Sequence, residues 1–127
     1  MKSTKSEGAH FDVSALHAAL DAERVARSMT WKDVAAESGV SASTLTRLSQ
    51  GRRPDVDSLS ALSGWLGISA EQFMGGRQRA AAFGTASPLA QISTIIRDDP
   101  DLNPDAAAAL EELIKATYLR LRTRNRK

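Results

Sequence analysis

The 127-residue sequence contains no cysteine, so it can form neither a disulfide framework nor a thiolate metal site. It has no apolar run of the length that a membrane-spanning helix requires, and residues 1–10 lack the hydrophobic stretch of a signal peptide. The sequence also shows no strand pattern, internal repeat, catalytic constellation or cofactor motif. These absences predict an all-α cytoplasmic protein that is not an enzyme, binds no metal or other cofactor and does not enter a membrane.

The sequence does contain enough apolar material for a core, since 42% of its residues are hydrophobic and 25% are charged. The net charge is only +2, and the charges are unevenly placed. Between Ser14 and Gly75, six basic residues are balanced by seven acidic ones. Asp98 to Glu112 carries six acidic and no basic residues, whereas Lys115 to Lys127 carries six basic and no acidic ones. Contacts with nucleic acid must therefore come from local charges and helix starts, not from overall charge.

Capping signals and apolar spacing predict a series of short helices in the first part of the chain. The first follows Asp12 or Ser14 and runs to about residue 28. Thr30 and Asp33 form a capping box that opens the second, which ends before Gly39. Three more are expected over about 41–50, from Asp55 or Asp57 to Gly67, and over 70–74.

The C-terminal part is expected to form a helical hairpin. Ser87 and Pro88 place a cap and an N1 proline before a helix over 89–97, and Asn103-Pro104-Asp105 opens a last helix to about Arg122. The expected organisation is a disordered N-terminus over 1–11, a helix-turn-helix domain over 12–75, a linker over 76–87 and a C-terminal helical region with a basic tail over 88–127.

Two short helices joined by a tight turn at Gly39 are the arrangement that a helix-turn-helix requires. Apolar residues have the spacing needed to hold the pair and to close a core behind it: Val34, Ala35, Val40, Leu45, Leu48, Leu59, Leu62, Leu66, Ile68 and Phe73. The stretch from Met29 to Pro54, continued from Leu59 to Phe73, resembles the XRE, or lambda-repressor-like, family of bacterial and phage transcriptional regulators. The resemblance implies an all-α, five-helix domain that binds duplex DNA.

The resemblance also implies that the 41–50 helix enters the major groove. The side chains that would face base edges are Ala42, Ser43, Thr46 and Arg47. Arg47 is the best candidate for discrimination, because a guanidinium pairs bidentately with guanine O6 and N7. The residues implied as phosphate contacts are Arg24, Thr30, Trp31, Lys32, Ser41, Gln50, Arg52 and Arg53.

Two features depart from the family pattern. Trp31 stands where the family often has glutamine, so it either packs on the sugar-phosphate edge or caps the small core. The recognition helix has few long polar side chains, so part of the specificity is expected to come from DNA shape. Arg52 and Arg53 are either phosphate contacts or a charged loop.

An apolar stripe on the C-terminal hairpin exceeds what about forty residues can bury alone. The residues expected to mediate dimerisation are Leu89, Ile92, Ile95, Ile96, Leu110, Leu113, Ile114, Thr117 and Leu121. In an antiparallel pair of last helices, acidic ends would meet basic ends. The alternative is packing on the DNA-binding domain of the same chain. The basic tail either reaches DNA phosphates or is solvated.

The sequence therefore predicts a transcriptional regulator, a repressor by preference, that binds a dyad-symmetric operator as a homodimer. The competing hypothesis is an antitoxin or immunity regulator, which would bind a partner protein through its C-terminal region and autoregulate transcription.

Overall fold

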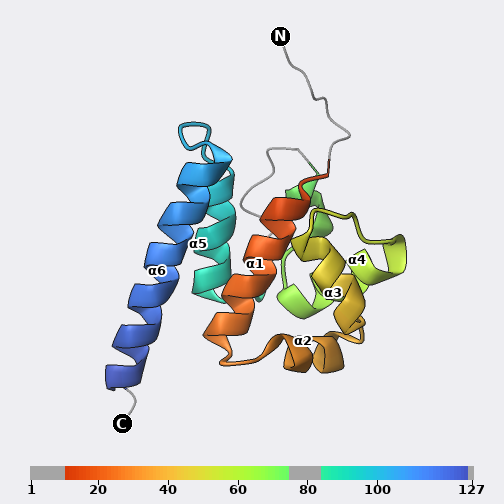
Figure 1. The fold of residues 1–127 in the computed structure, drawn as a ribbon, viewed down its shortest axis with the longest axis horizontal. Coiled ribbons are helices and arrows are strands. Elements are labelled where there is room, and N and C mark those ends of the chain that lie inside the picture. Colours follow the sequence, from red (N-terminus) through yellow and green to blue (C-terminus); the bar gives the residue numbers. More distant parts are fainter. Residues whose placement is uncertain (1–10, 75–83, 126–127) are drawn as a thin grey trace.

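The computed structural model describes residues 11–74 and 84–125, and within these ranges the protein is all-helical, as the sequence predicts. The elements are α1 (Val13–Ala26), α2 (Trp31–Ser38), α3 (Ala42–Ser49), α4 (Val56–Leu66), the short 3₁₀ helix η2 (Ala70–Phe73), α5 (Pro88–Arg97) and α6 (Pro104–Asn125). In Figure 1, α1 lies in the middle, with α5 and α6 on one side and α2, α3 and α4 on the other. No helix in the described ranges has the length and apolar composition needed to cross a bilayer.

Most of the expected disordered N-terminus and most of the expected linker lie outside the described residues. Phe11, the last residue of the expected disordered segment, is instead buried in the core at 6% exposure. The next residue explains why, because the Asp12 N–H donates to the Phe73 carbonyl at 2.7 Å and holds the chain against η2.

Helix starts follow the capping signals of the sequence. Where two caps were possible, Asp12 opens α1 and Asp55 opens α4, each accepting a hydrogen bond from a backbone N–H three residues later. Thr30 and Asp33 form the expected capping box, and the Ser41 hydroxyl accepts from the first turn of α3. Such caps contribute about 1 kcal/mol each, so local sequence determines where these helices begin.

Helix ends depend on left-handed residues. Gly39 and Gly67 have φ of +81° and +82° and end α2 and α4. A Cβ on Gly67 would also lie 2.8 Å from the backbone nitrogen of Ala86, so glycine permits the close passage of the chain that leads into α5. Helix α1 ends at Ala26, earlier than expected, because Ser28 adopts a φ of +58° that a helix cannot continue.

One hydrophobic core joins α1 to both halves of the chain. Leu16 and Leu20 of α1 are completely buried against side chains of α2, α3, α4 and η2. The same cluster contains Leu89 and Ala90 of α5, which are 3% and 0% exposed. Helix α5 therefore completes the core of the N-terminal half. Leu89, expected at a dimer interface, packs within its own chain.

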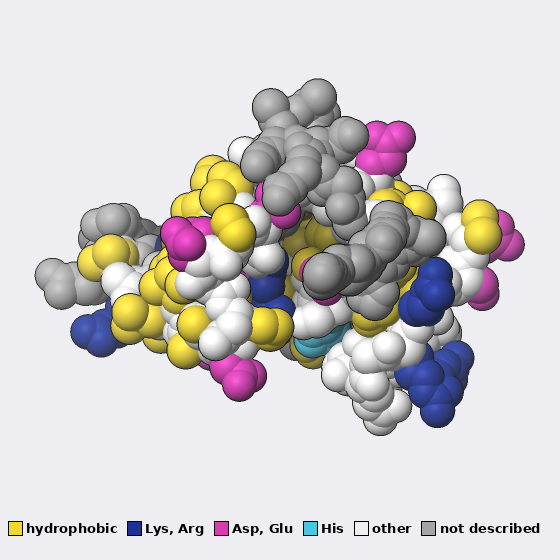
Figure 2. Space-filling model, turned by 90° about the horizontal axis from the view of Figure 1, so that it is seen from above, with side chains coloured by type: hydrophobic (Ala, Val, Ile, Leu, Met, Phe, Trp, Pro, Cys, Tyr) yellow, Lys and Arg dark blue, Asp and Glu magenta, His cyan; other side chains and the backbone are white. Residues whose placement is uncertain are grey.

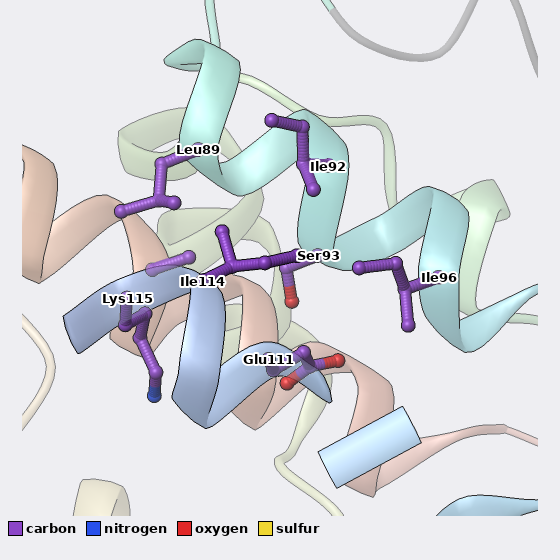
Figure 3. A pocket seen from close by; sticks show the side chains of 8 residues that line it. Leu89, Ile92, Ser93, Ile96, Glu111, Ile114 and Lys115 are labelled. Carbon is purple, nitrogen blue, oxygen red and sulfur yellow. The ribbon is translucent and has the colours of Figure 1, made fainter. Parts of the chain in front are cut away.

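Helix α6 lies across α1 and α5 and leaves apolar side chains exposed on its outer side. Ala107 is buried, and Ile114 and Tyr118 are partly buried against the core. Figure 3 shows the junction of the three helices, where Ser93 and Glu111 line a cavity of about 10 Å³. A cavity of this volume holds at most one water molecule. Figure 2 shows hydrophobic side chains gathered over the α5–α6 side of the molecule.

Candidate nucleic-acid interface

Helices α2 and α3 form the expected pair around the turn at Gly39. Val40 fills the turn at 4% exposure, and Leu45 and Leu48 anchor the back of α3 at 4% and 2%. Val34 is completely buried on the side of α2 that meets the core. Because one side of α3 is fixed in the core, its other side points outward as a unit.

The outward side of α3 presents the four residues expected to face bases, namely Ala42, Ser43, Thr46 and Arg47, all of which are exposed. The Thr46 hydroxyl donates to the carbonyl of Ala42 at 3.1 Å, so it is partly used within the helix. Arg47 lies 3.5 Å from the Thr44 hydroxyl, a distance at which a hydrogen bond is weak. Its guanidinium can therefore leave this contact for a base edge at little cost.

The start of α2 offers N–H donors beside that face. The Thr30 hydroxyl accepts from the backbone N–H of Asp33 at 3.1 Å, so the N–H groups of Trp31 and Lys32 remain to bind an anion. The hydrogen bond from the Thr30 backbone N–H holds the pKa of the Asp33 carboxyl below its ordinary value. Asp33 is therefore ionised, and it places a negative charge near the same helix start.

Trp31 is held against α1. Its ring stacks on His17 with the centroids 5.1 Å apart and the planes 18° from parallel. The guanidinium of Arg24 lies over the Trp31 ring, 5.1 Å from its centroid, bonds to Asp21 at 2.7 Å and donates to the Met29 carbonyl at 3.0 Å. Arg24, expected as a phosphate contact, is thus engaged within its own chain and fixes the indole. The indole packs on α1 and also borders the face of α3.

A hollow of about 240 Å³ separates the start of α2 from α3. Its lining residues are His17, Trp31, Lys32, Ala42, Leu45, Thr46 and Ser49. It brings together four residues expected to contact DNA, two from α2 and two from α3, and it adds His17 and Ser49, which sequence reasoning missed. Burial lowers the pKa of His17, so this ring is neutral at physiological pH. No spacing rule connects residue 17 to residue 31, so a sequence signal for the contact does not exist.

The other expected phosphate contacts lie at the two ends of α3. Ser41 is exposed at its start, while Gln50, Arg52 and Arg53 are exposed just after its end. The Arg52 N–H donates to the Arg47 carbonyl at 2.9 Å, which folds the loop back on the helix. Exposed donors therefore flank the outward face of α3 at both ends.

Arg27 ties the pair to the rest of the domain. It bonds to Glu23 at 2.8 Å, lies 4.4 Å over the ring of Trp65 and donates to the Trp65 carbonyl at 3.0 Å. The Trp65 indole N–H in turn donates to Glu37 of α2 at 2.9 Å. These contacts fix α2 between α1 and α4, and sequence reasoning identified none of them.

A buried turn, an anchored α3 with an open face and a helix start beside it define a helix-turn-helix protein. Residues 20–73 match the family model described as helix-turn-helix, and this segment is a helix-turn-helix domain of the XRE, or lambda-repressor-like, family. The family is one of DNA-binding regulatory domains, and the match supports a DNA-binding transcription regulator in this general sense. No curated protein and no solved structure matches the chain.

Proposed function

We propose that the protein is a sequence-specific transcriptional repressor that binds a dyad-symmetric operator in duplex DNA as a homodimer. The observation that carries this proposal is the exposed face of α3, on which Arg47 stands free of any strong contact beside the N–H donors of Trp31 and Lys32. A helix fixed in the core on one side and open on the other can enter a major groove without rearrangement.

Specificity rests on few direct contacts. Arg47 reads a guanine. The side chains of Ala42, Ser43 and Thr46 are short, so they either contact a base edge closely or leave space beside it. Phosphates bind at the start of α2 and at the exposed groups around α3, namely Ser41, Gln50, Arg52 and Arg53. Since direct readout is sparse, sequence-dependent DNA shape contributes the remainder.

Repression follows from size and placement. A dimer of this chain that covers an operator within a promoter excludes polymerase by its bulk, and this mode of action requires no further contact. Activation requires a further surface that recruits polymerase, whereas in this proposal the exposed face of α3 binds DNA and the exposed face of α5 and α6 binds a second copy of the chain.

The face on α5 and α6 fits a second copy of the chain. Its exposed apolar side chains are Ile92, Ile95, Leu110, Leu113 and Leu121, with exposures between 36% and 63%. On α6, Glu112 is exposed near the start of this apolar stretch, and Arg120 is exposed near its C-terminal end. An antiparallel pair related by a two-fold axis therefore joins acidic to basic ends over an apolar centre. The same symmetry matches two operator half-sites.

The test of this proposal is selection of bound duplexes from a random pool by the full chain. We expect an inverted repeat whose half-sites share one preferred guanine, bound about a thousandfold more tightly than random duplex at physiological salt. Equal binding to selected and random duplexes would show an architectural DNA-binding protein instead. A monomeric chain that forms a complex with the product of a neighbouring gene would favour the antitoxin hypothesis.

A further inference from the structure

The side of α6 that meets α1 is unusually rich in charged groups. Glu111 is only 6% exposed and accepts a hydrogen bond from Arg97 at 2.6 Å, and Arg97 also donates to the Ser14 hydroxyl at 2.7 Å. Lys115, with a side chain 14% exposed, pairs with Asp21 of α1. Figure 3 shows Glu111 and Lys115 projecting from α6 at this junction. Paired groups with little exposure fix the register of α6 on α1, because a shift would leave charges buried without partners.

Farther along α6, Arg122 caps the end of α1. Its guanidinium donates to the carbonyls of Ala26 and Val25, the latter at 2.8 Å, and to the Ser28 hydroxyl at 2.7 Å. The last carbonyls of a helix lack partners within it and carry partial negative charge, so a cation there is favourable. Ser28 is the residue with left-handed φ, so Arg122 holds the turn at its strained position.

This turn leads directly to the start of α2. Asp21, which pairs with Lys115, also holds Arg24, and Arg24 in turn contacts the Met29 carbonyl and the ring of Trp31. Two routes therefore run from α6 to the first residue of α2. One passes through the capped turn and the other through the ion pairs on the surface of α1.

We propose that α6 positions the phosphate-binding start of α2, with Arg122 and Lys115 as positioning residues that do not touch DNA. This inference rests on the proposed function, since it assigns α6 a role in the same DNA contact. The backbone N–H groups of Trp31 and Lys32 bind a phosphate only when their direction is fixed, and short helices are easily displaced at their ends. The contacts from α6 supply that constraint.

The test compares full-length Arg122→Met with Arg120→Met, which removes the same charge from an exposed site on the same helix. Two quantities are measured: the NMR signal of the Trp31 indole N–H in the free protein, and affinity for an isolated operator half-site over a range of salt. Binding to a half-site does not depend on the dimer contact in which Arg120 is proposed to lie. Trp65, the other tryptophan, is the internal reference. Arg122→Met should shift the Trp31 signal, weaken half-site binding roughly tenfold and lower the salt dependence by about one phosphate contact. Arg122→Lys should recover part of the affinity, and Arg120→Met should leave the Trp31 signal unchanged.

Two results overturn the inference. If affinity falls while the Trp31 signal stays in place, Arg122 contacts DNA directly and does not act through α2. If Arg122→Met and Arg120→Met bind the half-site equally well, α6 does not set the start of α2. Should Arg122→Met unfold at the measuring temperature, Lys115→Met is judged by the same two readouts. Failure of the proposed function is seen separately, because the wild-type chain would then show no operator preference.

Discussion

Arg47 is an exposed side chain on α3 that combines long reach with several hydrogen-bond donors, and its contact with Thr44 is weak. We expect Arg47→Ala to cost about 1–3 kcal/mol of operator binding and to relax the preference at one base pair. The measurement is affinity for the selected operator and for its single-base variants. Ser43→Ala, on the same face, is the control and should change affinity much less. A uniform loss over all base variants would show that Arg47 binds a phosphate.

At the scale of single residues, the sequence predicted what depends on near neighbours. Thr30 and Asp33 are three residues apart, so their capping box is visible as a motif. Arg24 was expected to bind phosphate, and the structure shows it held by Asp21 and Trp31. The contact of Arg24 with Asp21 joins residues three apart on one helix, so the sequence could have indicated it. The stacking of Trp31 on His17 depends instead on how α2 folds back on α1. Contacts of that kind are set by the tertiary arrangement.

At the scale of helices, the packing of α5 has a direct consequence for stability. Leu89 is 3% exposed inside the core, whereas Ile95 on the same helix is 55% exposed. We expect Leu89→Ala to lower the free energy of unfolding by about 2–5 kcal/mol, because it leaves a cavity. Ile95→Ala should change it by less than about 1 kcal/mol. Urea unfolding at a protein concentration that keeps the chain monomeric measures both, and equal losses would contradict the placement of α5.

The ion pair between α1 and α6 predicts a pH dependence. Burial opposes ionisation of both groups, but the bonds with Lys115 and Arg24 lower the pKa of Asp21, and the bonds with Asp21 and Glu112 raise the pKa of Lys115. Stabilisation by Asp21 is complete above its ordinary value of 3.8 and is lost as pH falls through the lowered pKa. Stabilisation by Lys115 is complete below 10.5 and is lost as pH rises through the raised pKa.

The melting temperature of the wild-type protein should therefore exceed that of Lys115→Met by a difference that is constant between pH 3.8 and 10.5. This difference should become smaller below and above that range. The measurement is thermal melting in a pH series, with Lys32→Met, an exposed lysine, as the control. A margin that persists unchanged into strong acid would mean that Lys115 acts through the packing of its alkyl chain alone.

The helices themselves were largely predictable, and their packing was not. Ser87 with Pro88 predicted the start of α5 because capping is local. The apolar stripes of α5 and α6 indicated that something must cover them, but a stripe does not identify its partner. The structure divides the stripe: Leu89 packs within the chain, while Ile95 and Leu113 remain exposed. The charged residues that dock α6, including Glu111 and Arg122, had no signature in the sequence.

For the molecule as a whole, the two sides of α6 have different proposed roles. Its inner side holds the turn before α2 through Arg122, and its outer side exposes Leu113 and Leu121 for a second copy. The helix that would set the distance between two DNA-binding units also orients a DNA contact in each. Dimerisation and operator binding would then depend on each other through one element, which is a reciprocal coupling.

The dimer proposal is tested by Leu113→Glu, which places a charge on the most exposed apolar side chain of the α6 face, at 63%. Sedimentation should show a dimer for the wild-type chain and a monomer for the variant, because burial of an unpaired carboxylate is costly. Val56→Glu, at an apolar site 80% exposed at the start of α4, is the control and should remain dimeric. Since two linked units bind a dyad far more tightly than one, Leu113→Glu should weaken binding to the full operator by about a hundredfold or more. Binding to an isolated half-site should change little. A variant that remains dimeric, or that loses full-site and half-site affinity equally, would remove this face of α6 from the dimer.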